Sequence, residues 1–154
     1  MTLTDAKDLA TVLGVAIALV TLIKGVLEFT QQGAQKRAEQ FTTMRKRFKD
    51  DPSFKNICDL LETDDPELRE IPFKDKRDFL GFFEEIALML NSGVIRPGVA
   101  HYMFGYYAIR CSESDNFWSS VNRNSPYWSL FNDFVATMKR VEKGFTLDKR
   151  RLRF

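Results

Sequence analysis

The sequence predicts an all-α protein with one N-terminal transmembrane helix followed by a small helical domain. Residues 9–27 form an almost uninterrupted apolar stretch whose one charge is Lys24. Four of the five prolines stand where a helix would begin, and no stretch alternates with a period of two for long enough to indicate a strand. The chain has 154 residues, is 44% hydrophobic and contains 14 Phe, enough for one globular core.

The apolar stretch has the length of a membrane span. A helix over residues 9–27 would be about 28 Å long, close to the roughly 30 Å hydrocarbon core of a bilayer. A cleaved signal peptide fits poorly, because the first residues are not basic and no small-residue cleavage site follows. A buried core helix stays open as an alternative, because the strictly uncharged run covers only residues 9–23. We therefore predict a transmembrane segment within residues 1–30.

The charges beside this segment predict its orientation. Residues 1–8 hold one Lys and two Asp, whereas residues 24–51 hold seven basic and four acidic residues. Positive charge stays on the cytoplasmic side, so we expect the N-terminus outside and the rest in the cytoplasm. Two well-separated cysteines, Cys58 and Cys111, fit that reducing compartment. Residues 31–51 then form a basic helical neck, and residues 52–154 form a cytosolic helical domain that binds a ligand or a partner.

Proline and glycine positions divide the rest of the chain into helices. Proline costs nothing at a first helical position, and an Asp or Ser before it caps the helix. In the neck, Phe41, Met44 and Phe48 form a short seam suited to association with a partner or a second copy. Only residues 146–154 could be extended. We predict helices over residues 31–49, 52–62, 66–70, 75–91, 97–111 and 126–143, and a short one from Ser114.

Few residues offer catalytic chemistry. His101 lies in an apolar helix and is predicted to be a partly buried histidine rather than a general base. Glu84 and Glu85 are adjacent on a helix, so they point about 100° apart and cannot act as an acid–base pair. One of them is expected to be half-buried, as a cap or as the partner of a basic group. Phosphate-binding, hydrolase and metal-site motifs are missing, so we predict a non-enzymatic protein without cofactor, catalytic residue or metal.

Charge is distributed unevenly, and its C-terminal part predicts the binding site. Residues 52–138 hold eight basic and thirteen acidic residues, whereas residues 139–154 hold seven and two. Attraction to anionic lipid headgroups would explain the basic neck. The basic tail would bind an anionic ligand, lie on a lipid surface or serve solubility alone. Tryptophan faces could stack on bases, although a core position is the favoured alternative for these aromatic residues. The predicted ligand-binding residues are Arg140, Lys143, Lys149, Arg150, Arg151, Arg153, Trp118 and Trp128.

The central stretch supports a resemblance to a known class of proteins. It runs Arg77-Asp-Phe-Leu-Gly-Phe-Phe-Glu-Glu-Ile-Ala87, then Ser92-Gly-Val-Ile95, then Phe104-Gly-Tyr-Tyr107. This pattern resembles an uncharacterised family of small bacterial single-pass membrane proteins with a helical cytosolic domain. The order of parts also resembles small membrane effectors of type III CRISPR systems. That resemblance implies the bacterial inner membrane, antiviral defence and a cyclic oligoadenylate ligand.

Together these observations predict a membrane-anchored effector whose cytosolic domain binds an anionic nucleotide such as cyclic tetra-adenylate. A ligand with four phosphates and near-fourfold symmetry suits a symmetric homo-oligomer, with a tetramer favoured. Membrane lipid is a second expected partner, and duplex nucleic acid is not expected. The alternative is a membrane-tethered adaptor whose helical domain binds a protein partner.

Overall fold

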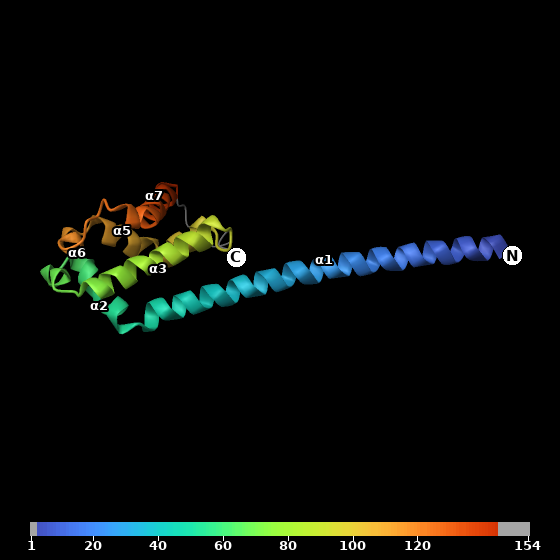
Figure 1. Cartoon of the computed structure of the whole chain (residues 1–154), viewed down its shortest axis with the longest axis horizontal. Helices are drawn as coiled ribbons and strands as arrows, with labels where there is room; N and C mark the ends of the chain where they lie inside the picture. The colour runs from blue at the N-terminus through green and yellow to red at the C-terminus, as the bar shows by residue number, and fades with distance from the viewer. Residues whose placement is uncertain (1–2, 145–154) are drawn as a thin grey trace. The chain divides into compact units, whose positions relative to one another are not determined.

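The computed structural model describes the backbone of residues 3–144 and the side chains of residues 13–28, 32–33 and 35–144. The described chain is helical and forms no strand, which confirms the predicted all-α class. It divides into two compact units, unit 1 (Met1–Glu39) and unit 2 (Gln40–Phe154). The elements are α1 (Leu3–Asp50), α2 (Pro52–Thr63), the 3₁₀ turn η1 (Pro66–Arg69), α3 (Phe73–Asn91), α4 (Pro97–Ala100), the π-helix η2 (His101–Gly105), α5 (Tyr106–Glu113), α6 (Asp115–Trp118), the 3₁₀ turn η3 (Pro126–Trp128) and α7 (Ser129–Lys143) (Figure 1).

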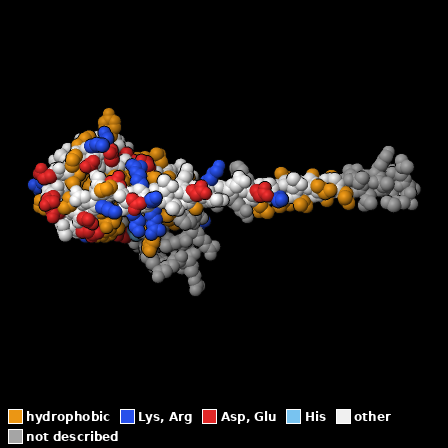
Figure 2. All heavy atoms as spheres, turned by 90° about the horizontal axis from the view of Figure 1, so that it is seen from below, with side chains coloured by type: hydrophobic (Ala, Val, Ile, Leu, Met, Phe, Trp, Pro, Cys, Tyr) orange, Lys and Arg blue, Asp and Glu red, His pale blue; other side chains and the backbone are white. Residues whose placement is uncertain are grey.

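Unit 1 exposes the apolar side chains of the predicted span. Figure 2 shows hydrophobic side chains along its described part, interrupted by charged ones. Of the residues described with side chains, no helix contains an apolar stretch long enough to cross a membrane. Residues 9–12 of the predicted span lie outside that set. The large exposed hydrophobic residues are Leu13, Val15, Ile17, Leu19, Val20, Leu22, Ile23, Val26 and Leu27.

The helix starts in unit 2 follow the predicted proline positions. The Asp51 carboxylate accepts hydrogen bonds from the Ser53 and Phe54 amides, at 2.9 and 3.2 Å, and so caps α2. Asp65 caps η1 and Ser125 caps η3 in the same way. Arg96 precedes α4 without a side-chain cap, because an arginine has only hydrogen-bond donors.

The predicted helix over residues 97–111 is divided into three parts, and this is the main difference from the expectation. It begins as α4, passes through η2 and continues as α5 to Glu113. In the π-helix, a Cβ at position 105 would lie 2.9 Å from Cδ2 of His101, so only Gly105 allows the imidazole to lie there. After α3 the chain turns at Gly93, which adopts a φ of +68°.

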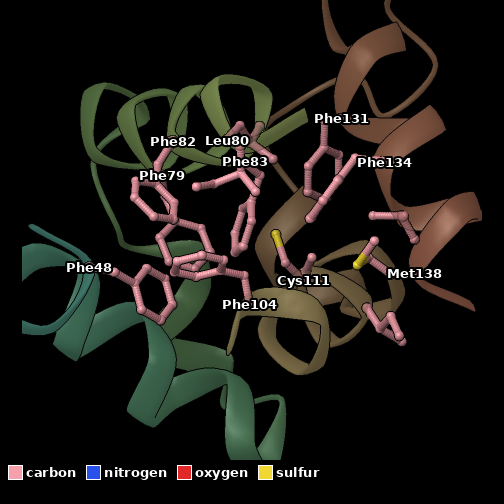
Figure 3. Close-up of a cluster of buried hydrophobic side chains, with 14 of the residues drawn as sticks. Phe48, Phe79, Leu80, Phe82, Phe83, Phe104, Cys111, Phe131, Phe134 and Met138 are labelled. Carbon is pink, nitrogen blue, oxygen red and sulfur yellow. The ribbon is translucent and has the colours of Figure 1, made fainter. Parts of the chain in front are cut away.

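Phenylalanine rings form the core of unit 2. Figure 3 shows the rings of Phe48, Phe79, Phe82, Phe83 and Phe104 gathered together. The Phe48 ring stacks on that of Phe82 at 5.1 Å and meets the Phe104 ring edge-on at 5.6 Å. On the other side of the core, α7 packs against α3 and α5 and adds Phe131, Phe134 and Met138.

The seam of the neck contributes to this core. Phe41 and Phe48 are buried, and Met44 packs against the same cluster. The expectation that the seam serves a partner or a second copy is therefore wrong. Its partner is the rest of unit 2, because the α1–α2 turn at Asp51 folds α2 back and lets the Phe48 and Phe54 rings meet at 6.2 Å.

Candidate ligand-binding site

The structure does not bring the predicted binding residues together in the part that it describes. Arg140 and Lys143 are exposed in the last turn of α7. Trp128 precedes the first residue of that helix, so Arg140 lies about 18 Å away along the helix axis. Lys149, Arg150, Arg151 and Arg153 lie outside the described residues.

The two tryptophans have structural surroundings. Trp118 is buried, and its indole N–H donates to the Cys111 carbonyl at 2.8 Å. Its ring packs against Phe117 and Phe131, and the Arg123 guanidinium lies 5.7 Å from its centroid. Trp128 is half-buried against the core. Trp118 is thus a core residue, whereas the ring of Trp128 stays partly accessible.

A cavity of about 310 Å³ in unit 2 offers a better binding site. It lies between the end of α1, α2, and the segment formed by η2 and α5. Its volume is at the lower end of the range of about 300–1,000 Å³ that small-molecule sites occupy. The lining residues are Arg45, Phe48, Lys49, Lys55, Cys58, Asp59, Met103, Phe104 and Tyr107.

Three cations and one carboxylate stand around this cavity. Arg45 and Lys49 lie one turn apart on α1, and Lys55 lies in the first turn of α2. All three are exposed, and none forms an ion pair or a side-chain hydrogen bond with another described residue. Asp59, one turn after Lys55, is the one acidic lining residue. The cavity therefore carries a net charge of +2 and suits an anion with several acceptor oxygens.

The floor of the cavity is apolar and chemically inert. Phe48 and Phe104 are 9% and 1% exposed, and Met103 is half-buried. Burial, together with the charges of Asp59 and Glu62, raises the pKa of the Cys58 thiol to about 12. Cys58 is therefore a neutral thiol at physiological pH rather than a nucleophile. Met103 and Phe104 belong to the π-helix, a conformation that is frequent at functional sites.

A hydrogen-bonded cluster holds the wall of the cavity at Tyr107. The Tyr107 hydroxyl donates to Oε1 of Glu62 at 3.0 Å, and the Tyr106 hydroxyl donates to Oε2 at 2.8 Å. The Arg110 Nε–H donates to the Tyr106 oxygen at 3.3 Å. Hydrogen bonds from Tyr106 and Tyr107 lower the pKa of Glu62, whereas burial and the bond to Glu62 raise the pKa of Tyr107 to about 12. The cluster thus holds the Glu62 carboxylate between two hydroxyl donors.

The two glutamates of α3 lie in different surroundings, and Glu84 is the half-buried one. Glu85 is exposed, and both its oxygens lie 3.0 Å from Nη1 of Arg47. Glu84 is half-buried, and burial raises its pKa while a hydrogen bond from the Phe131 backbone opposes that shift. In the described part of the chain, no group of three or more His, Cys, Asp or Glu side chains could hold a metal ion.

Sequence reasoning missed the cavity, although two of its signals were visible. The basic neck was recognised, but its cations were assigned to lipid headgroups. Asp51-Pro52 predicted the end of one helix and the start of another, yet not that α2 would fold back against α1. Spacing along the chain cannot show that Lys55 and Tyr107 line one cavity, because a tertiary contact brings them together.

Comparison with known proteins finds no significant match to this chain, whether among protein-family models, curated sequences or solved structures.

Proposed function

We propose that this protein is a non-enzymatic, membrane-anchored effector whose helical domain binds an anionic nucleotide of the cyclic oligoadenylate type. The observation that carries the proposal is the cavity of unit 2, in which Arg45, Lys49 and Lys55 surround an aromatic floor. Phosphate requires converging cations, and a base requires an apolar, flat surface. Both are present within one cavity, whose charge is not neutralised by its neighbours.

Exposed apolar side chains support the membrane anchor. Nine large hydrophobic side chains between residues 13 and 27 are 54–66% exposed. Exposure of this much apolar surface is unfavourable in water and favourable in hydrocarbon. We propose that the span over residues 9–27 lies in the bacterial inner membrane, with unit 2 in the cytoplasm. The many cations after the span favour that orientation.

The size of the cavity suggests how a cyclic ligand would be shared. A volume of about 310 Å³ admits one nucleotide unit rather than four. A homotetramer would offer four such cavities to cyclic tetra-adenylate. Ligand binding that favours one arrangement of subunits would then reposition the membrane helices, because a ligand shifts an equilibrium by its differential affinity for two states.

A pair of matched charge reversals tests the site. Cyclic tetra-adenylate is titrated by calorimetry into the full chain, purified in detergent. The cavity variant Arg45→Glu/Lys49→Glu is expected to bind about 100-fold more weakly or worse, because two charge-assisted contacts become repulsive. The tail variant Arg150→Glu/Arg151→Glu changes the charge equally and is expected to keep its affinity within a few-fold. Loss of binding in the tail variant alone would return the site to the predicted C-terminal residues.

Ionic strength separates this proposal from a protein adaptor. Binding of a phosphate-bearing ligand by exposed cations should weaken steeply between low and high salt. A chain that binds no nucleotide at any salt concentration contradicts the proposal.

A further inference from the structure

We infer that Glu62 is a positioning residue of the cavity, which fixes the ring of Tyr107 as the wall for the planar base of one bound nucleotide unit. This inference rests on the proposed function, because it assigns a ring-binding surface within the same cavity. It adds a source of selectivity, since the cations alone would not distinguish a nucleotide from any other phosphate.

Tyr107 is the aromatic wall that an occupant can reach. Among the rings that line the cavity, Phe48 and Phe104 are nearly buried and Tyr107 is half-buried. The Phe48 ring supports the Tyr107 ring from within, at a centroid distance of 5.9 Å. Stacking of a base on such a ring strengthens binding by about tenfold or more.

The Glu62 carboxylate holds the Tyr107 ring by accepting a hydrogen bond from the Tyr107 hydroxyl. Its two carboxylate oxygens accept from two neighbouring phenols, at 2.8 and 3.0 Å, so the carboxylate is fixed at both ends. The two tyrosine rings meet edge-on at 5.1 Å, and the Arg110 guanidinium lies 5.6 Å from the Tyr106 centroid. Tyr106, Arg110 and Glu62 thus form a frame, and Tyr107 is the member of it that lines the cavity.

Glu62 and Tyr107 each keep one protonation state over the physiological range. The pKa of Glu62 is lowered and that of Tyr107 is raised to about 12, so the carboxylate and the phenol coexist at neutral pH. Ring selectivity should therefore not change between about pH 6 and pH 9. A selectivity that changed across this window would contradict the assignment.

The test compares two probes that differ only in the base. 5′-AMP and ribose 5-phosphate are titrated by calorimetry into the full chain in detergent, and the ratio of their affinities is measured. We expect the wild type to prefer 5′-AMP by about tenfold or more. Tyr107→Ala should reduce the ratio to about one and leave the affinity for ribose 5-phosphate unchanged. A loss of structure would instead weaken both probes together.

Variants of the frame test the role of Glu62. Glu62→Ala and Tyr107→Phe each remove the hydrogen bond between the Glu62 carboxylate and the Tyr107 hydroxyl, so each should lower the ratio by about threefold. The double variant should lower it no further, because both changes remove the same interaction. Tyr107→Phe decides the matter if Glu62→Ala fails to fold. Tyr102→Ala is the matched control, since Tyr102 is an exposed tyrosine of the π-helix that does not line the cavity.

Three outcomes would overturn the inference, and they differ from failure of the proposed function. Additive losses in the double variant, or an unchanged ratio in Glu62→Ala, would exclude Glu62 as a positioning residue. Equal wild-type affinities for the two probes would exclude a ring wall while leaving a phosphate site in place. Binding of neither probe nor of cyclic tetra-adenylate would overturn the proposed function itself.

Discussion

Large hydrophobic side chains are exposed in the described part of unit 1 and mostly buried in unit 2. Between residues 13 and 27, large aliphatic side chains are 54–66% exposed. In unit 2, ten phenylalanines are 9% exposed or less, and even the charged Lys76 is fully buried. Both regions are helical, so helix formation does not account for the difference.

The difference lies in what surrounds each helix. An isolated helix can hydrogen-bond its backbone but cannot cover its own side chains. In unit 2 several helices cover one another, and α7 packs on both α3 and α5. In unit 1 the described residues form one helix, which cannot cover its own apolar surface, and the proposed bilayer would supply a cover. The predictions below test this contrast.

Truncation of a core ring should have the largest effect. Phe83 is fully buried, and its ring contacts those of Phe79, Phe131 and Phe134. Phe83→Ala should lower the free energy of unfolding of unit 2 by about 3–5 kcal/mol, because it leaves a cavity. Urea unfolding followed by circular dichroism measures the change. Leu22→Ala, at an exposed position of unit 1, should leave it within about 0.5 kcal/mol.

A charge in the apolar segment should have the next largest effect, on membrane retention. Leu19→Arg should make insertion less favourable by about 3 kcal/mol, since an arginine near the middle of a span is costly. Extraction of cell membranes with alkaline carbonate measures retention. Leu88→Arg is the matched control, because Leu88 of α3 is 56% exposed and Leu19 is 54% exposed. Equal release of both variants, or of neither, would contradict the proposed anchor.

The sequence predicted the helical fold well because its signals are local. Asp51, Asp65 and Ser125 cap helices or turns within three residues, so spacing alone reveals them. The division of residues 97–111 was not predictable in this way. It depends on the approach of the His101 ring to Gly105. A glycine within a helical pattern does not by itself predict a π-helix.

The predicted binding site and the cavity share their kinds of residue but not their position. Cations and aromatic rings were predicted as the groups that would bind an anionic nucleotide, and groups of the same kinds line the cavity at other residues. Net charge favoured the tail, whereas the cavity depends on the fold of α1 against α2. The same fold explains why Phe41 and Phe48, which looked like an association seam, are covered by unit 2.

The last comparison is between two lysines, Lys24 of unit 1 and Lys76 of unit 2, and its expected effect on stability is the smallest. The Lys24 side chain is 76% exposed and lies 3.8 Å from Glu28. Lys76 is fully buried; its ammonium donates to the Ser120 hydroxyl at 3.1 Å and lies 5.6 Å from the Phe117 centroid. Burial lowers the pKa of Lys76, so the folded protein disfavours the ammonium that the unfolded chain accepts.

The sign of the pH effect follows from this shift. Between the lowered pKa of the folded state and the ordinary value of 10.5, the unfolded chain binds more protons than the folded one. Lys76 therefore makes the free energy of unfolding rise with pH in that window. The buried thiols of Cys58 and Cys111 act in the opposite sense, because their raised pKa values keep protons on the folded protein. The Lys76 effect is accordingly measured as a difference between variant and wild type at each pH.

Lys76→Met should remove the alkaline rise and leave stability at pH 7 equal to that of the wild type or about 1 kcal/mol higher. Methionine fills a similar volume and needs no desolvation, although it loses the bond to Ser120 and the contact of the ammonium with the Phe117 ring. Urea unfolding at several pH values between 7 and 11 measures both effects. Lys24→Met should change neither, because Lys24 belongs to unit 1 and is not part of the buried core of unit 2. Parallel pH profiles of Lys76→Met and wild type would show that the buried ammonium makes no net contribution to the contrast between the two units.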